Sequence, residues 1–261
     1  MSTPNDNTFV MDDYSALLSG FDQISLAEMD NVQLMSRTDT KFVFNLEFFP
    51  EILQKLRTHY RVLNVDGNNI SNYNTLYYDT DDFKFYMHHH CGKGNRSKVR
   101  KRTYVESQLQ FFEVKNKNNK EITIKKRIRI MDNSPQLDEA SLAFYHENAM
   151  VNDADLKPKL WVNYARITLV NKHQAERLTL DLMLQFKNEN TTKHLNNIVI
   201  AELKQEKRCK SVFNEVIKQY SIRELSISKY CLGVISLYQN VKQNNFKPKL
   251  LTLKKIIHEL Y

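Results

Sequence analysis

Glycine and proline are scarce in this chain of 261 residues, with five of each. Because these residues interrupt helices and strands, their scarcity predicts that most of the chain is regular secondary structure. The sequence contains neither the G-x-x-x-x-G-K-[ST] pattern of a P-loop nor the G-x-G-x-x-G pattern of a dinucleotide-binding fold. Both kinds of nucleotide site are therefore excluded.

Cysteines and long apolar runs are also few. Cys91, Cys209 and Cys231 stand far apart, so they offer neither a disulfide framework nor zinc-binding spacing, as is typical of a reducing compartment. The longest apolar stretch, around 231–238, is about half of the roughly 20 residues that a membrane span needs. The first residues lack the basic and apolar regions of a secretory signal. We expect a cytoplasmic protein without a transmembrane segment.

Positive charge is in excess. The chain has 38 Lys and Arg against 30 Asp and Glu, which gives a net charge of +8. Such an excess favours a polyanionic partner, which can be nucleic acid, anionic lipid or a chain of phosphates.

Apolar periodicity predicts one α+β domain with helical flanks. Helical spacing covers 47–60, 81–90 and 138–148 and returns from 212 to 261, and strand-like alternation covers 71–78 and most of 98–204. We divide the chain into a lead-in with a short helix (1–30), a main domain (31–240) and a C-terminal helical extension (241–261).

Seven of the expected strands carry charged residues at every second position. Because neighbouring strand residues point to opposite faces, these charges share one face of the sheet. That face holds twelve bases: Arg37, Lys41, Lys98, Arg100, Arg102, Lys115, Lys125, Arg127, Arg129, Arg166, Arg177 and Lys204. It also holds four acids: Asp39, Glu113, Asp181 and Glu202.

An ordinary amphipathic sheet, with its charged face in water, explains any one of these strands. The excess of bases across all seven favours a closed sheet with a cationic, water-filled tunnel that holds an anion. In this arrangement Arg100 and Arg102 face the tunnel, whereas Lys101 faces outward in solvent and is expected to be dispensable. Lys126 bears the same relation to Arg127.

The order of several short motifs resembles the VTC (vacuolar transporter chaperone) polyphosphate polymerase domain, within the CYTH-like triphosphate tunnel metalloenzyme superfamily. The resemblance covers roughly 34–233. The motifs are Ser36-Arg37-Thr38-Asp39-Thr40-Lys41-Phe42, Tyr78-Asp79-Thr80, Lys98-Val99-Arg100-Lys101-Arg102, Phe112-Glu113-Val114-Lys115, Tyr164-Ala165-Arg166, Glu176-Arg177-Leu178-Thr179-Leu180-Asp181, Glu202-Leu203-Lys204 and Ser228-Lys229-Tyr230.

This resemblance implies a closed antiparallel β-barrel, with helices packed outside and at the C-terminus. It also implies a metal-dependent polymerase that transfers the ATP γ-phosphate to a growing polyphosphate chain with Mn²⁺ or Mg²⁺. The implied catalytic residues are Lys41, Arg100, Arg102, Lys115, Arg166, Arg177 and Lys229. The implied phosphate-binding residues are Arg37, Lys98, Arg127, Arg129, Lys204 and Ser228. Glu202 is the implied metal ligand, with Asp39, Glu113 and Asp181 as further candidates, although for Asp39 and Asp181 we favour pairing with neighbouring arginines.

Two departures from the family pattern affect the interpretation. The superfamily opens with Glu-x-Glu-x-Lys, whereas this chain has Arg37-x-Asp39-x-Lys41, which argues against a two-metal hydrolytic site. The family's additional lysine before the Ser-Lys pair is missing, and Ser226 stands near that place. A triphosphatase or nucleotide cyclase on the same fold, and a non-catalytic polyphosphate-binding module, remain alternatives. Nucleic acid is not expected as a partner because no recognition helix or RNP-type strand is visible.

Other residues have less pronounced patterns. Three consecutive histidines, 88–90, cannot converge on one metal ion from a helix, but His89 or a neighbour can line the tunnel mouth. Tyr73 and Tyr77 are expected in the barrel wall or core. Lys117 and the C-terminal lysines, Lys249 among them, are expected on the solvated surface.

Overall fold

The computed structural model describes residues 14–30, 38–120, 122–132, 134–152 and 155–257. Eleven strands form a single sheet. They are β1 (Asp22–Ser25), β2 (Thr38–Asn45), β3 (Tyr60–Asn64), β4 (Ile70–Asp79), β5 (Arg96–Tyr104), β6 (Leu109–Lys117), β7 (Thr123–Ile130), β8 (Lys157–Asn171), β9 (Glu176–Lys187), β10 (Thr192–Leu195) and β11 (Ile198–Gln205). The seven charged strands of the sequence analysis correspond to β2, β5, β6, β7, β8, β9 and β11. The α+β class is confirmed.

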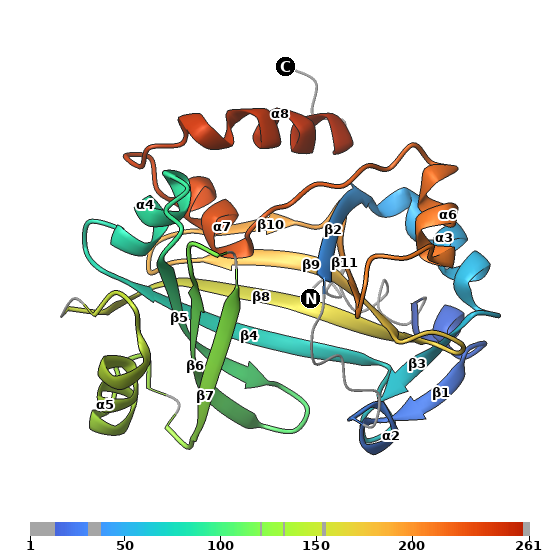
Figure 1. Cartoon of the computed structure of the whole chain (residues 1–261), viewed down its shortest axis with the longest axis horizontal. Coiled ribbons are helices and arrows are strands. Elements are labelled where there is room, and N and C mark those ends of the chain that lie inside the picture. Colours follow the sequence, from blue (N-terminus) through green and yellow to red (C-terminus); the bar gives the residue numbers. More distant parts are fainter. Residues whose placement is uncertain (1–13, 31–37, 121, 133, 153–154, 258–261) are drawn as a thin grey trace, which may run out of the picture.

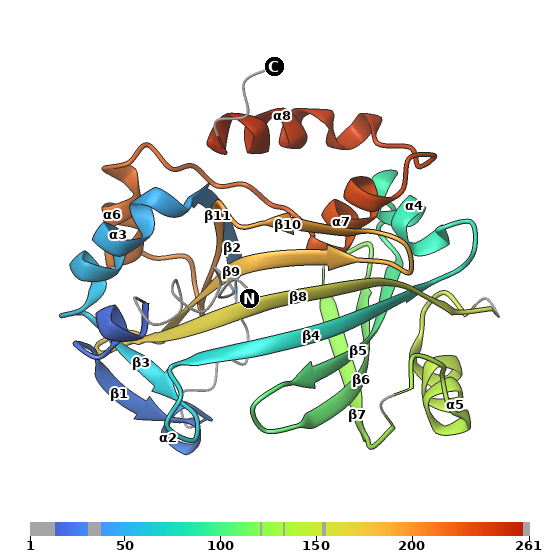
Figure 2. The same ribbon diagram turned by 180° about the vertical axis from the view of Figure 1, so that it is seen from behind.

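Helices lie at both ends of the sheet and above it in Figures 1 and 2. They are α2 (Leu26–Asp30), α3 (Phe49–Leu56), α4 (Lys84–His90), α5 (Glu139–Asn148), α6 (Val212–Lys218), α7 (Lys229–Leu237) and α8 (Lys247–Ile256), with short 3₁₀ turns η1 (Leu46–Phe48) and η2 (Asn244–Phe246). None of the helices within the described residues has the length and hydropathy that crossing a bilayer requires. The expected helix over 47–60 ends earlier, and Tyr60 begins β3 instead.

The sheet is open, so the closed barrel that we expected is wrong. The strand order is β2-β11-β9-β8-β4-β5-β6-β7, and among the described residues β2 and β7 do not pair with each other. The outer edge of β2 is taken by the chain that leads into α7, because Phe42 bridges Glu224 and the Leu225 amide donates to the Lys41 carbonyl at 2.8 Å. At Lys41 and Phe42, therefore, the edge of β2 is not available to a further strand.

Alternation along the strands sends apolar residues to the outer face. There, α3 and α6 cover β2, β8, β9 and β11 with one buried cluster, and α5 covers β4, β5 and β6 with another. In α3 the buried residues Phe49, Ile52, Leu53 and Leu56 follow the i, i+3, i+4, i+7 spacing of a helix with one apolar side. The charged face of the sheet therefore turns away from these helices.

The inner face has two halves, and α7 packs on one of them. Leu160, Val162, Leu184 and Phe186 belong to a buried cluster with Tyr230 and Val234 of α7. For Leu184 and Phe186 of β9 to face α7, the strand must change which of its alternating residues point inward. A bulge near Met183 provides this change, and the φ of Met183, 54°, lies in the left-handed region. Asp181 before the bulge and Leu184 after it consequently point to the same side. The other half of the inner face carries the charges.

Candidate functional site

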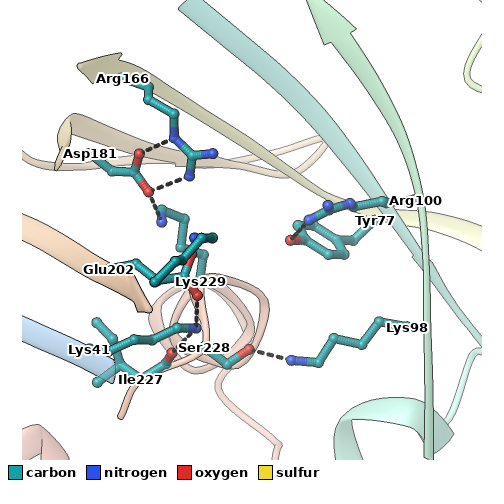
Figure 3. Close-up of polar contacts among 11 residues, drawn as sticks. Lys41, Tyr77, Lys98, Arg100, Arg166, Asp181, Glu202, Ile227, Ser228 and Lys229 are labelled. Atoms are coloured by element: carbon teal, nitrogen blue, oxygen red, sulfur yellow. Dashed lines mark hydrogen bonds and ion pairs between the residues drawn. The ribbon is translucent and has the colours of Figure 1, made fainter. Parts of the chain in front are cut away.

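Charged side chains from β2, β5, β8, β9, β11 and the first turn of α7 converge on one space, which we call the lumen (Figure 3). The alternation predicted from the sequence places them there. The predicted residues that lie on this inner face are Lys41, Lys98, Arg100, Arg102, Lys115, Arg166, Lys204, Ser228 and Lys229, with the acids Glu113, Asp181 and Glu202.

Asp181 holds two cations of the lumen in place. Its carboxylate accepts hydrogen bonds from Arg166 Nε at 2.6 Å and Nη2 at 2.8 Å, and it forms an ion pair with Lys229 of α7. Asp181 is 2% exposed, and burial alone would raise the pKa of its carboxyl; Arg166 and Lys229 instead hold that pKa well below its usual range. The expected pairing of Asp181 with a neighbouring arginine is confirmed.

Glu202 lies between two lysines. It pairs with Lys204 on its own strand, and its Oε1 is 3.7 Å from Lys41 Nζ on β2, the neighbouring strand. Burial opposes ionisation of this carboxyl, but the two lysines lower its pKa below the usual value. Glu202 therefore stays anionic at neutral pH.

Glu113 is the third carboxylate of the lumen. It accepts from Arg100 Nε at 2.7 Å and from Lys125 Nζ at 3.1 Å, and it is 1% exposed. Burial raises the pKa of Glu113, yet Arg100, Arg102 and Lys125 bring it down to about 2. Arg100 also donates from Nη1 to the Tyr77 hydroxyl at 3.1 Å, so its guanidinium is fixed from two sides.

Aromatic rings line the wall between the arginines. Tyr73 stacks on Tyr164 with ring centroids 5.1 Å apart, and the guanidinium carbons of Arg102 and Arg166 lie 5.3 Å and 5.0 Å from the Tyr73 ring centroid. Arg102 Nη2 donates to the Tyr164 hydroxyl at 3.1 Å. Tyr73 thus belongs to the wall, as expected. Its contact with two arginines was not predicted, although its inner position on β4 was the available signal.

At the end of the lumen near α7 the structure has a cavity of about 200 Å³. Its basic lining residues are Lys41, Arg96, Lys98, Lys115, Lys117 and Lys249, together with His89, and none of the described Asp or Glu residues lines it. His89 lines this cavity, and Lys117 and Lys249, which we expected on the solvated surface, are half-buried and line it too. The fold brings α8 and the end of β6 to this cavity, which spacing along the chain could not indicate.

Lys98 connects the cavity to α7. Its Nζ donates to the Ser228 hydroxyl at 2.9 Å, and that hydroxyl caps α7 by accepting from the Cys231 amide. Burial, assisted by Lys41 and Lys115, lowers the pKa of Lys98 to about 8. A bound anion would offset this cost, because an opposite charge favours the ammonium form.

Other predicted residues lie away from this centre. Arg177 reaches toward α2, where its Nη2 is 3.5 Å from the Met29 carbonyl oxygen. Arg127 and Arg129 are exposed on β7, with Arg127 stacked over Phe111 at 4.3 Å from the ring centroid. Asp39 is exposed on β2. Arg37 lies outside the described residues.

Within the described ranges no three His, Cys, Asp or Glu residues gather as a ligand set. Hard divalent cations, however, often bind through one or two carboxylates with phosphate oxygens and water as the other ligands. Glu202, anionic and 20% exposed at its side chain, fits such a role better than Asp181 or Glu113, whose side chains are 2% and 1% exposed.

Comparison with known proteins assigns the family. The VTC domain model matches residues 36–238, so the chain belongs to the VTC domain family. No curated protein matches the sequence.

Three solved structures resemble this chain at low sequence identity. An adenylyl cyclase-like protein from Hippeastrum with a dominant triphosphatase activity has 11% identity and a TM-score of 0.45, and covers 79% of this chain and 98% of its own. An adenylate cyclase-like protein from Vibrio parahaemolyticus has 8% identity and a TM-score of 0.44, with 76% and 99% covered. A conserved hypothetical protein from Pyrococcus furiosus has 11% identity and a TM-score of 0.37, with 70% and 88% covered.

Proposed function

We propose that this protein is a metal-dependent polyphosphate polymerase, which transfers the γ-phosphate of ATP to a growing polyphosphate chain in the lumen. The observation that carries the proposal is the surplus of positive charge on the inner face. Each of the three carboxylates on this face is paired with two cations, and further bases, Lys98, Arg102 and Lys115 among them, surround the same space. Such a surplus suits a ligand with several negative charges.

Phosphoryl transfer needs positioning and charge neutralisation more than covalent catalysis. Arginine guanidinium groups make planar, bidentate contacts with phosphate oxygens, and lysine supplies a mobile point charge. Arg100 and Arg166 are already oriented by buried carboxylates, so little freedom is lost when a phosphate binds. A terminal phosphate is anionic near neutral pH and attacks without a dedicated base.

Glu202 is the residue that would hold Mn²⁺ or Mg²⁺. The bound cation would neutralise charge on the phosphate oxygens. For Glu202 to bind it, the ion must compete with Lys41 and Lys204 for the same carboxylate. With Glu202 engaged in this way, Lys204 would be available to phosphate oxygens.

The product formed from ATP tests the proposal. Purified protein with ATP and Mn²⁺ should yield ADP and long-chain polyphosphate. Lys229→Met should abolish this activity, because Lys229 forms an ion pair with Asp181 in the lumen. Lys126→Ala, on the outer face of β7, should not change it. Free phosphate or cyclic nucleotide as the main product would instead assign a triphosphatase or a cyclase. Tight polyphosphate binding without turnover would assign a binding module.

A further inference from the structure

The C-terminal helix α8 forms part of the cavity at the end of the lumen. It lies above α7 in Figures 1 and 2, and its residues fall outside the family match, which ends at 238. Leu250 and Leu253 of α8 line the cavity together with Phe246, the residue that precedes the helix. These side chains also pack on the cluster beneath α7, so α8 is anchored to the domain.

Helix α8 also brings a cation. Lys249 Nζ donates to the Ser226 carbonyl at 2.7 Å, just before the first turn of α7, and Lys249 lines the same cavity. Lys249 thus places an ammonium group beside Ser226, whose own side chain is a neutral hydroxyl. The cavity receives this charge from a segment that lies more than twenty residues further along the sequence.

The cavity has two chemically different walls. The wall toward the sheet carries Lys41, Lys98 and Lys115, which it shares with the lumen. The wall toward α7 and α8 carries the apolar side chains of Leu232, Ile235, Phe246, Leu250 and Leu253, together with Lys249, Ser226 and Ser228. An inorganic phosphate chain has no apolar part, so these apolar side chains would not contribute to its binding. A ligand with an anionic end and a flat apolar body matches both walls.

We propose that this cavity binds the nucleoside of a nucleoside triphosphate, with its base against Phe246, Leu250 and Leu253 and its phosphates directed past Lys98 into the lumen. This inference rests on the proposed function, since it identifies where the phosphate donor lies. Because hydrocarbon side chains contact a base without reading its edge, ATP and GTP should bind with similar affinities.

A comparison of ligands tests this directly on the unmodified protein. ATP and abasic ribose 5′-triphosphate have the same phosphate chain and differ only in the base. In equilibrium titrations without divalent cation, ATP should bind about tenfold more tightly, as burial of an apolar group of this size predicts. Equal affinities for the two ligands would overturn the inference. If neither bound, the proposed lumen function would fail instead.

Variants of α8 test the same inference from the side of the protein. Leu250→Ala should weaken ATP binding about fivefold to tenfold and leave abasic ribose triphosphate unchanged, because only the base contacts this wall. Leu251→Ala is the matched control, since Leu251 is the adjacent residue on α8 and is 45% exposed. Binding of the abasic ligand also reports that each variant is folded. A parallel loss for both ligands, or no loss for ATP, would contradict the assignment.

Discussion

Replacing Arg102 with alanine is the sharpest test of the cationic lumen. Arg102 lies on the inner face of β5 and donates to the Tyr164 hydroxyl. Unlike Arg100 and Arg166, it forms no ion pair with a carboxylate in the part of the chain that the structure describes. Its removal therefore leaves no buried carboxylate without its partner, and the fold should tolerate the change.

The expected loss of triphosphate affinity follows from one hydrogen bond between Arg102 and a phosphate oxygen. A hydrogen bond between a charged donor and a phosphate oxygen contributes about 1.5–3 kcal/mol. Arg102→Ala should therefore weaken inorganic triphosphate binding by roughly tenfold to hundredfold. Its thermal midpoint should stay close to that of the wild type.

The adjacent Lys101 provides the opposite case. It faces away from the lumen, as alternation predicts, but it is 7% exposed rather than solvated. Its Nζ donates to the carbonyls of Ser134 and Gln136, both at 2.8 Å. Lys101→Ala should cost about 2 kcal/mol of stability, which lowers the midpoint by roughly 4–8 °C. Triphosphate affinity should not change.

Lys126 provides an exposed control. It is exposed on the outer face of β7, so Lys126→Ala should change neither affinity nor stability by more than about 0.5 kcal/mol. Titration of inorganic triphosphate at fixed salt and thermal unfolding measure the two quantities for all three variants. Loss of affinity in Lys101→Ala or Lys126→Ala comparable to that in Arg102→Ala would indicate a diffuse basic surface, and the lumen would not be the binding site.

Glu202→Gln should abolish metal-dependent turnover, measured as ADP release, because a neutral amide is a poor ligand for a hard cation; wild-type turnover would remove Glu202 from the site. Triphosphate affinity should fall above about pH 8, since Lys98 loses its proton there. Tyr77 adds to this loss because it becomes anionic in the same range: nearby cations lower its pKa to about 8 against the effect of burial. The pH titration should flatten in the double variant Lys98→Arg/Tyr77→Phe, and an unchanged profile would contradict the assignment. Gly233→Ala should destabilise the fold by about 1–3 kcal/mol in denaturant unfolding, because the added Cβ would lie 2.5 Å from Leu160 Cδ2; wild-type stability would mean that α7 can shift.

Strand alternation was sufficient to predict which faces carry the charges. Lys41, Arg100, Arg166 and Glu202 came from four strands far apart in sequence, and each lies on the inner face as its parity required. The prediction held because side-chain direction on a regular strand depends only on position. Exposure does not follow from parity, which explains the error at Lys101: the loop that accepts its hydrogen bonds lies on the outer face.

The inner face of β9 departs from simple alternation. Continued alternation after Asp181 would have placed Met183 and Gln185 inward, whereas the bulge turns Leu184 and Phe186 toward α7. A residue with positive φ at Met183 has no signal in the sequence, since glycine or asparagine would ordinarily be expected there. The apolar half of the inner face, and hence the seat of α7, could not be predicted for this reason.

The open sheet connects these observations. Because residues 224 and 225 occupy the edge of β2, the chain is carried across the opening to α7, whose first residues then face the lumen. Ser228 and Lys229 reach Lys98 and Asp181 from this position, so contacts of a loop and a helix terminus join β5 to β9 where strand pairing does not. This position of α7 also leaves room for α8 to contribute the second wall of the cavity. Closure by strands would have placed backbone at this position instead, and the cationic lumen would have no neighbouring space for the apolar part of a ligand.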